Sequence, residues 1–147
     1  MTMRKLVIIL TIFAVAQICG CANREVRTPA TTAKSNAMEL VTQIKNTDVH
    51  WDGTYLGLRP NLGGVSKELR TRLTADLIPA LVDALKDKKR FVAAHVLLTE
   101  FSGVQFEADA GTWNGLQVEL LPNGQAVIPD SQQASLVRQW NDWLAKH

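Results

Sequence analysis

The stretch "RFVAAHVLLTEFSG" (residues 90–103) decides the fold, because its apolar residues cover nearly every side of a helix. One face holds Phe91, Ala94, His95 and Leu98, and the neighbouring face holds Val92, Val96 and Thr99. A helix with this distribution is buried among other elements and does not lie on a surface. Gly103 predicts the end of the helix, since glycine readily adopts the left-handed conformation found there. The other elements are therefore expected to surround this segment.

A second helical segment precedes it and is separated from it by the polar turn "KDKK" (residues 86–89). Ser66 predicts the start of this segment, as serine commonly caps a helix N-terminus. Pro79 lies inside the pattern and lacks a backbone donor, which predicts either a kink or a break at Ile78 with Pro79 in a fresh turn. The apolar face of the segment consists of Leu69, Leu73, Leu77, Leu81, Val82 and Leu85.

Upstream, a short helix is expected from Asn36 to about Asn46, because Asn36 and Glu39 have the spacing of a capping box. Residues 47–65 follow, rich in glycine, asparagine and aspartate and interrupted by Pro60. We interpret them as a long connection whose apolar residues contact the core. Those residues are Val49, Trp51, Tyr55, Leu56 and Leu58.

The C-terminal part changes to a period of two over residues 115–129, around the hairpin signal Asn123-Gly124. With these two residues as the loop, Leu120 faces Val127 and Glu119 faces Ile128. A capping box of Asp130 and Gln133 then predicts a last helix. The apolar stripe of that helix contains Leu136, Val137, Trp140, Trp143 and Leu144. These elements predict an α+β fold, a small mainly helical domain with one β-hairpin and a C-terminal helix.

The N-terminus has the order of a secretory signal, with Arg4 and Lys5 before the apolar run "LVIILTIFAVA" (residues 6–16). A permanent membrane helix needs about 20 apolar residues, so this run is too short to be one. Ile18, Cys19 and Gly20 then precede Cys21, and this order resembles the lipobox of bacterial lipoproteins. The resemblance implies cleavage between Gly20 and Cys21 and lipidation of Cys21. An ordinary signal peptide cleaved near Ala22 is the alternative.

These assignments predict a signal peptide at residues 1–20, a lipidated cysteine and flexible tether at 21–35, and one globular domain at 36–147. The chain has 16 Lys+Arg and 14 Asp+Glu, and removal of Arg4 and Lys5 leaves 14 of each. A neutral mature chain gives no reason to expect nucleic acid binding. Cys19 and Cys21 are the only cysteines, which argues against a metal or redox pair.

The lipobox resemblance also implies a location, which is the bacterial cell envelope. Ala22 after the cysteine resembles the sorting state of outer-membrane lipoproteins, so in a Gram-negative organism the periplasmic face of the outer membrane is expected. The expected partners are the membrane, through the lipid, and another envelope protein.

The run "LIPALVDALKDKKRFVAAHVLL" (residues 77–98) resembles a HEAT-type repeat in its kink proline, in Asp87 at the turn and in Val92 followed by small residues. We assign a HEAT-like helix pair to about residues 75–103. True arrays bury their faces by stacking about three or more units. One unit therefore does not imply their concave binding surface.

Four residues are candidates for a site: His50, Asp52, His95 and Glu100. His95 is a titratable ring in an apolar helix, and the alternative is a structural histidine bonded to a carbonyl, to Glu100 or to Asp109. His50 and Asp52 flank Trp51 in the glycine-rich region. A metal site usually needs three or four ligands, so these residues alone predict no metal and no cofactor.

Further clusters have structural explanations. A basic cluster around the turn at residues 86–89 could contact anionic head groups. Asp83 and Asp87 interleave with it, however, as in a solvated turn. The cluster consists of Lys86, Lys88, Lys89 and Arg90, together with Lys67, Arg70 and Arg72. Trp140 and Trp143 share a stripe with core leucines.

Neither a nucleophile elbow nor a phosphate-binding loop is present in the sequence. The sequence thus predicts a non-enzymatic, membrane-anchored interaction or structural module. The alternative is an envelope hydrolase or a small-ligand or metal-binding protein that uses His50, Asp52, His95 and Glu100.

Overall fold

The computed structural model describes residues 29–55, 57–106, 112–123 and 125–147. The expected signal peptide, the cleavage site at Gly20, Cys21 and the first part of the tether lie outside these residues. The helices are α1 (Pro29–Gln43), α2 (Gly64–Arg70), α3 (Ile78–Ala84), α4 (Phe91–Ser102) and α5 (Gln133–Leu144), with short 3-10 turns η1 (Asn46–Asp48), η2 (Ala75–Leu77) and η3 (Asp130–Gln132). The strands are β1 (Val49–Thr54), β2 (Gly57–Leu62), β3 (Thr112–Trp113), β4 (Leu116–Gln117), β5 (Glu119–Leu120) and β6 (Ala126–Val127).

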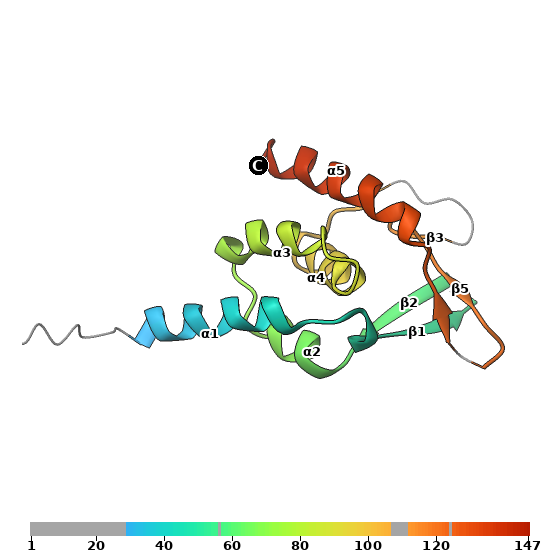
Figure 1. The fold of residues 1–147 in the computed structure, drawn as a ribbon, viewed down its shortest axis with the longest axis horizontal. Coiled ribbons are helices and arrows are strands. Elements are labelled where there is room, and N and C mark those ends of the chain that lie inside the picture. The colour runs from blue at the N-terminus through green and yellow to red at the C-terminus, as the bar shows by residue number, and fades with distance from the viewer. Residues whose placement is uncertain (1–28, 56, 107–111, 124) are drawn as a thin grey trace, which may run out of the picture.

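Helix α4 lies at the centre of the molecule, as its composition predicts. Nine consecutive residues, from Phe91 to Thr99, are buried. Figure 1 shows α5 on one side of the α3–α4 pair, α1 and α2 on the other, and the strands together at one end. The α+β fold class with a C-terminal helix is confirmed. Among the described residues, none of the helices combines the length and the apolar character needed to cross a membrane.

The ends of α3 and α4 also follow the sequence. Helix α3 begins at Ile78 with Pro79 in its first turn, where the missing backbone donor has no consequence. Of the two alternatives for Pro79, the break is therefore observed and the kink is not. Helix α4 ends at Ser102 and is capped by Gly103, which has a φ of 67°. The likeness of this helix pair to a HEAT repeat stays a prediction.

Helix α1 begins at Pro29 and not at Asn36, so residues 29–35 of the expected tether are helical. Toward the other end of the helix, Ala37 and Val41 are buried, and Ile44 follows them directly after the helix ends at Gln43. Helix α1 contacts α2 and α3.

Residues 47–65 are not a long connection, which corrects the sequence prediction. They contain η1 and the antiparallel pair β1–β2, with Val49 opposite Leu62. Val49 and Trp51 are buried while His50 and Asp52 are exposed, which is the alternation of a half-buried strand. In the sequence Pro60 indicates a break, because proline cannot donate to a ladder, but an edge strand tolerates it.

The N-terminal caps of α2 and α5 also differ from those that the sequence predicts. Helix α2 begins at Gly64, and Ser66 lies inside it, buried. No capping box links Asp130 and Gln133; Asp130 belongs to η3 and pairs with Lys88, and the Gln133 side chain donates to the Leu85 carbonyl (2.7 Å). The stripe of α5 is confirmed, since Leu136 and Trp140 are buried and its other members pack against the core.

The expected single hairpin at residues 115–129 is two small hairpins in the structure. Strand β3 pairs with β4 across Asn114-Gly115, and β5 pairs with β6. Leu120 faces Ala126 and Glu119 faces Val127, one residue away from the predicted register. The reason is a longer loop: the Leu121 N–H donates to the Gln125 carbonyl at 2.8 Å, so three residues and not two lie between the last pair of bonded residues.

Candidate functional site

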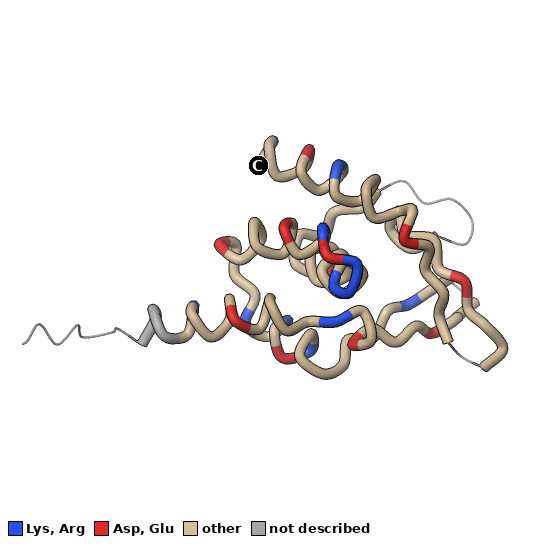
Figure 2. Tube along the Cα trace, viewed as in Figure 1, with Lys and Arg blue, Asp and Glu red and all other residues tan. Residues whose placement is uncertain are grey.

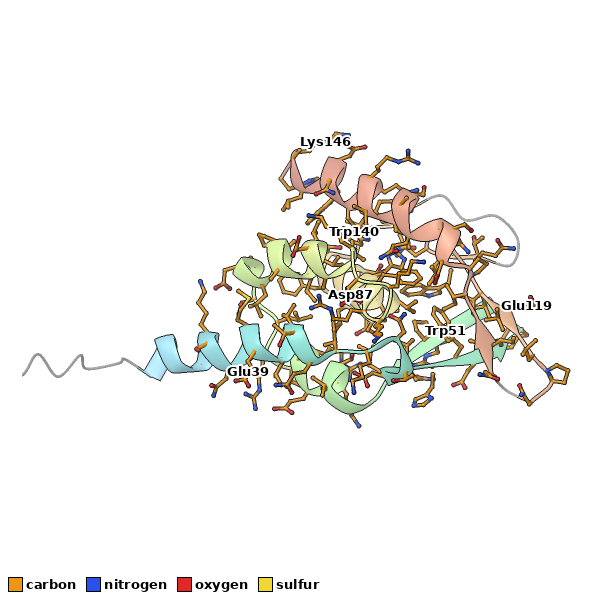
Figure 3. The ribbon with its side chains drawn as sticks, viewed as in Figure 1. Glu39, Trp51, Asp87, Glu119, Trp140 and Lys146 are labelled. Atoms are coloured by element: carbon orange, nitrogen blue, oxygen red, sulfur yellow. The ribbon has the colours of Figure 1, made fainter. Side chains whose placement is uncertain are left out.

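An open hollow of about 620 Å³ lies at the strand end of the molecule and is the candidate site. We call it the β1 hollow. Its walls come from η1, β1, the start of α4 and the segment around β6, that is, from residues 46–47, 49–52, 91–92, 125–126, 128 and 130. Figure 3 places Trp51 at this end of the molecule, on β1. Phe91 and Val92 bring the central helix to the hollow.

Two of the four candidate residues, His50 and Asp52, line the β1 hollow. Both lie on the exposed face of β1, where they alternate with the buried Val49 and Trp51. The Asp52 carboxylate accepts a hydrogen bond from the Asn61 side chain across the hairpin (2.5 Å). These side chains therefore provide hydrogen-bonding and charged groups at the rim.

His95 lies elsewhere and has no exposed surface. Trp140 donates its indole N–H to His95 Nδ1 at 2.9 Å, so the proton of the neutral ring is on Nε2, which lies 3.0 Å from the Asn114 carbonyl. Burial lowers the pKa of His95 from 6.5 to about 4, although the bond to Asn114 opposes this shift. Figure 3 shows Trp140 between α5 and the centre of the molecule.

His95 thus has the structural role that was its alternative explanation. Both ring nitrogens have partners, and the rings of Trp113 and Trp140 meet it edge-on. Glu100 is exposed and pairs with Arg70 at 3.7 Å, while Asp109 lies outside the described residues. The four candidate residues are therefore not gathered around one pocket: two line the β1 hollow, one is in the core and one is on the surface.

The basic cluster consists largely of paired charges. Lys86 contacts Asp83 (2.8 Å), Lys88 contacts Asp130 (3.0 Å), and Arg90 contacts Asp87 (2.8 Å). The Lys86 ammonium lowers the pKa of the Asp83 carboxyl, which is the direction expected for an ion pair. Figure 2 shows these charges of both signs at the turn between α3 and α4. This arrangement is that of a solvated turn.

Three asparagine and aspartate residues have structural roles that sequence reasoning missed. The Asn46 side chain donates to the Lys88 carbonyl (2.7 Å) and accepts from the Val92 N–H (2.9 Å), so it caps α4 from η1. The Asp48 carboxylate accepts from the N–H and the hydroxyl of Ser66, and so caps α2. Both caps come from far along the chain, and no local pattern indicates them.

Asn114 is the third, and a local signal for its turn was available. Asn114-Gly115 is a second Asn-Gly pair, of the kind that favours a tight hairpin, and Asn114 has a φ of 47°. Its buried side chain donates to the Thr99 hydroxyl (2.6 Å) and the Val104 carbonyl (3.1 Å) and accepts from the Phe106 N–H (2.5 Å).

Comparisons of the chain with protein families, with curated proteins and with solved structures give no match. Among the described residues, no three side chains of histidine, cysteine, aspartate or glutamate are grouped so that they could hold a metal ion.

Proposed function

We propose that this chain is a lipid-anchored protein of the bacterial cell envelope, and that its domain is a non-enzymatic module that binds another envelope component at the β1 hollow. The anchor is Cys21, after Ile18, Cys19 and Gly20. In a Gram-negative organism the protein faces the periplasm from the outer membrane.

The observation that carries the binding role is the composition of the β1 hollow. The half-buried Ala126 and Ile128 supply apolar surface beside the buried side chains of Trp51, Phe91 and Val92, while the exposed His50 and Asp52 supply polar groups from β1. An apolar surface with a few polar groups at its rim is the usual composition of a binding site. The histidine with the perturbed pKa, His95, is already engaged by Trp140 and Asn114 in the core.

The anchor is tested by growing cells with radiolabelled fatty acid and comparing two variants. Cys21→Ala is expected to lose the label and to move from the membrane fraction to the soluble fraction, because the sulfur that carries the lipid is gone. Cys19→Ala is the matched control and is expected to retain the label. Labelling that persists in Cys21→Ala contradicts the anchor.

The binding role is tested with a photo-crosslinking amino acid placed at one position at a time in living cells. A crosslinker at Gln125, in the β1 hollow, is expected to give an adduct with an envelope component. The same group at Asp142, exposed on α5, is the control and is expected to give none. If Gln125 gives no adduct, or if Asp142 gives the same one, the hollow is not the binding surface.

A further inference from the structure

We propose that the occupant of the β1 hollow is an extended peptide segment of a partner protein, carrying a lysine or arginine, which adds as a third strand to the free edge of β1. This inference rests on the proposed binding role and names the class of partner. Extended peptides commonly bind exposed sheet edges in this way, with main-chain hydrogen bonds for affinity and side-chain pockets for specificity.

Strand β1 has an edge that is not paired with another described strand. In the part of the chain that the structure describes, β1 pairs with β2 and with no other strand. The register places His50 opposite Asn61 and Trp51 opposite Pro60. A strand paired on one side presents a row of backbone donors and acceptors on the other.

The hydrogen-bond pattern of the β1–β2 ladder determines which backbone groups of β1 point away from β2. The Gly63 N–H donates to the Asp48 carbonyl at 2.7 Å, and these residues continue the register of the ladder. Hydrogen-bonded and non-hydrogen-bonded pairs alternate along an antiparallel ladder. His50 and Asp52, two and four residues beyond Asp48, therefore point their N–H and C=O groups toward β2. Trp51 lies between them and points its groups away from β2.

Pro60 agrees with this assignment. It lies opposite Trp51, at a pair that is not hydrogen-bonded, so its missing N–H would have pointed away from β1. The outer edge of β2 thus lacks one donor and also contacts β3. The edge of β1 has no proline between Val49 and Thr54, and although the Val49 N–H donates to the Asn46 carbonyl, Trp51 and Gly53 keep their outward N–H groups. Of the two edges of this sheet, that of β1 is the one suited to accept a strand.

The β1 hollow runs along this edge of β1. Residues 49–52 all line it, although their side chains alternate between the two faces of the sheet. A pocket on one face would be lined by every second residue, and one along an edge is lined by consecutive residues. Ala126 and Ile128 line the other side, from the segment around β6.

The charged residues of the β1 hollow favour a cationic ligand. The residues that line the β1 hollow include Asp52 and Asp130 but no lysine or arginine. Asp130 is exposed and paired with Lys88, and Asp52 is bonded only to the neutral Asn61 among the contacts described. A cationic side chain on the peptide would therefore meet complementary charge, with the half-buried Ala126 and Ile128 available for its apolar neighbours.

The test uses peptides selected on the protein from a displayed library of random decapeptides. Binders are expected to alternate β-branched residues with polar ones and to contain lysine or arginine. On binding, amide hydrogen exchange is expected to slow at least about tenfold at Trp51 and Gly53, whose N–H groups point outward, and to change little at His50 and Asp52, which already pair with β2. N-methyl groups on the alternate peptide residues whose N–H groups face β1 are expected to abolish binding, while N-methyl groups on the other alternate set are expected to leave it largely unchanged.

The charge is tested by Asp52→Asn, which keeps an acceptor for Asn61 and removes the carboxylate. This variant is expected to bind the selected basic peptide about twofold to fivefold more weakly, a typical size for one exposed charge pair. Asp142→Asn is the matched control and is expected to bind as the wild type does.

Three outcomes overturn the inference: no peptide is enriched, the enriched peptides protect other amides, or protection does not alternate along β1. Crosslinking from Gln125 in cells distinguishes this failure from failure of the proposed function. If that adduct forms while the edge of β1 remains unprotected by any peptide, the domain binds a partner in another way.

Discussion

Replacing Asn114 with glycine tests whether its side chain holds the segment after α4 against the core. Asn114 provides two donors and one acceptor, to Thr99, Val104 and Phe106. Glycine adopts the φ of 47° at this turn without strain, so the hairpin backbone is retained. The bond from His95 is also retained, because it goes to the main-chain carbonyl of residue 114.

The magnitude follows from the three groups that lose a partner. A buried group left unpaired costs about 1–3 kcal/mol. Thr99 is buried, whereas Val104 and Phe106 are half-buried and accessible to water in part, so the lower end of that range applies to each. The free energy of unfolding is therefore expected to fall by about 3 kcal/mol. This is a large fraction of the stability of a small domain.

The assay is urea unfolding followed by tryptophan fluorescence. With an m-value of about 1.5–2 kcal/mol per M, the midpoint is expected to fall by about 1.5–2 M. Asn123→Gly is the matched control, because the Asn123 side chain makes one exposed hydrogen bond, to the Gln125 N–H. A loss below about 1 kcal/mol for Asn114→Gly, or a loss equal to that of the control, refutes the reasoning.

Two further predictions concern the core and α2. The ring of His95 is expected to titrate with a pKa of about 4 by NMR. The unfolded chain binds this proton near pH 6.5, so the free energy of unfolding is expected to fall as the pH drops from about 6.5 to 4. The expected fall is about 3 kcal/mol in total. A flat profile of unfolding free energy against pH over this range would contradict the burial of His95. Gly64→Ala is expected to destabilise the domain more than Gly103→Ala in thermal unfolding. Both glycines have positive φ, so alanine is strained at either position. A Cβ at Gly64 would also lie 2.9 Å from an Asp48 carboxylate oxygen, whereas a Cβ at Gly103 would meet no atom within 4 Å. Equal losses of stability in the two variants would show that backbone strain alone decides.

Some of the fold could be predicted because its signals are local. The position of α4, the break before Pro79 and the stop at Gly103 follow from periodicity and from the backbone preferences of single residues. The stripe of α5 is predictable for the same reason. The β1–β2 hairpin was predictable in principle, since its alternation is visible at residues 49–52. Pro60 conceals it, because proline usually interrupts a strand, although it is tolerated at an outer edge.

The candidate site could be predicted only in part. His50 and Asp52 stand out as polar residues around a tryptophan, and both line the β1 hollow. Phe91 and Ile128 line the same hollow, but nothing near them in the sequence relates them to β1. Glu100 and His95 are equally conspicuous in the sequence, and the structure places them on the surface and in the core.

The sequence by itself determined which segment is buried and where its helix ends, because residues a few positions apart are held together by the chain. Only the tertiary structure decided how the helices are capped and what surrounds His95. Asn46 caps α4 at Val92, 46 residues away, and Trp140 donates to His95 over a separation of 45 residues. Such contacts form only once the elements have packed, since each depends on the meeting of two segments that the chain does not hold near each other.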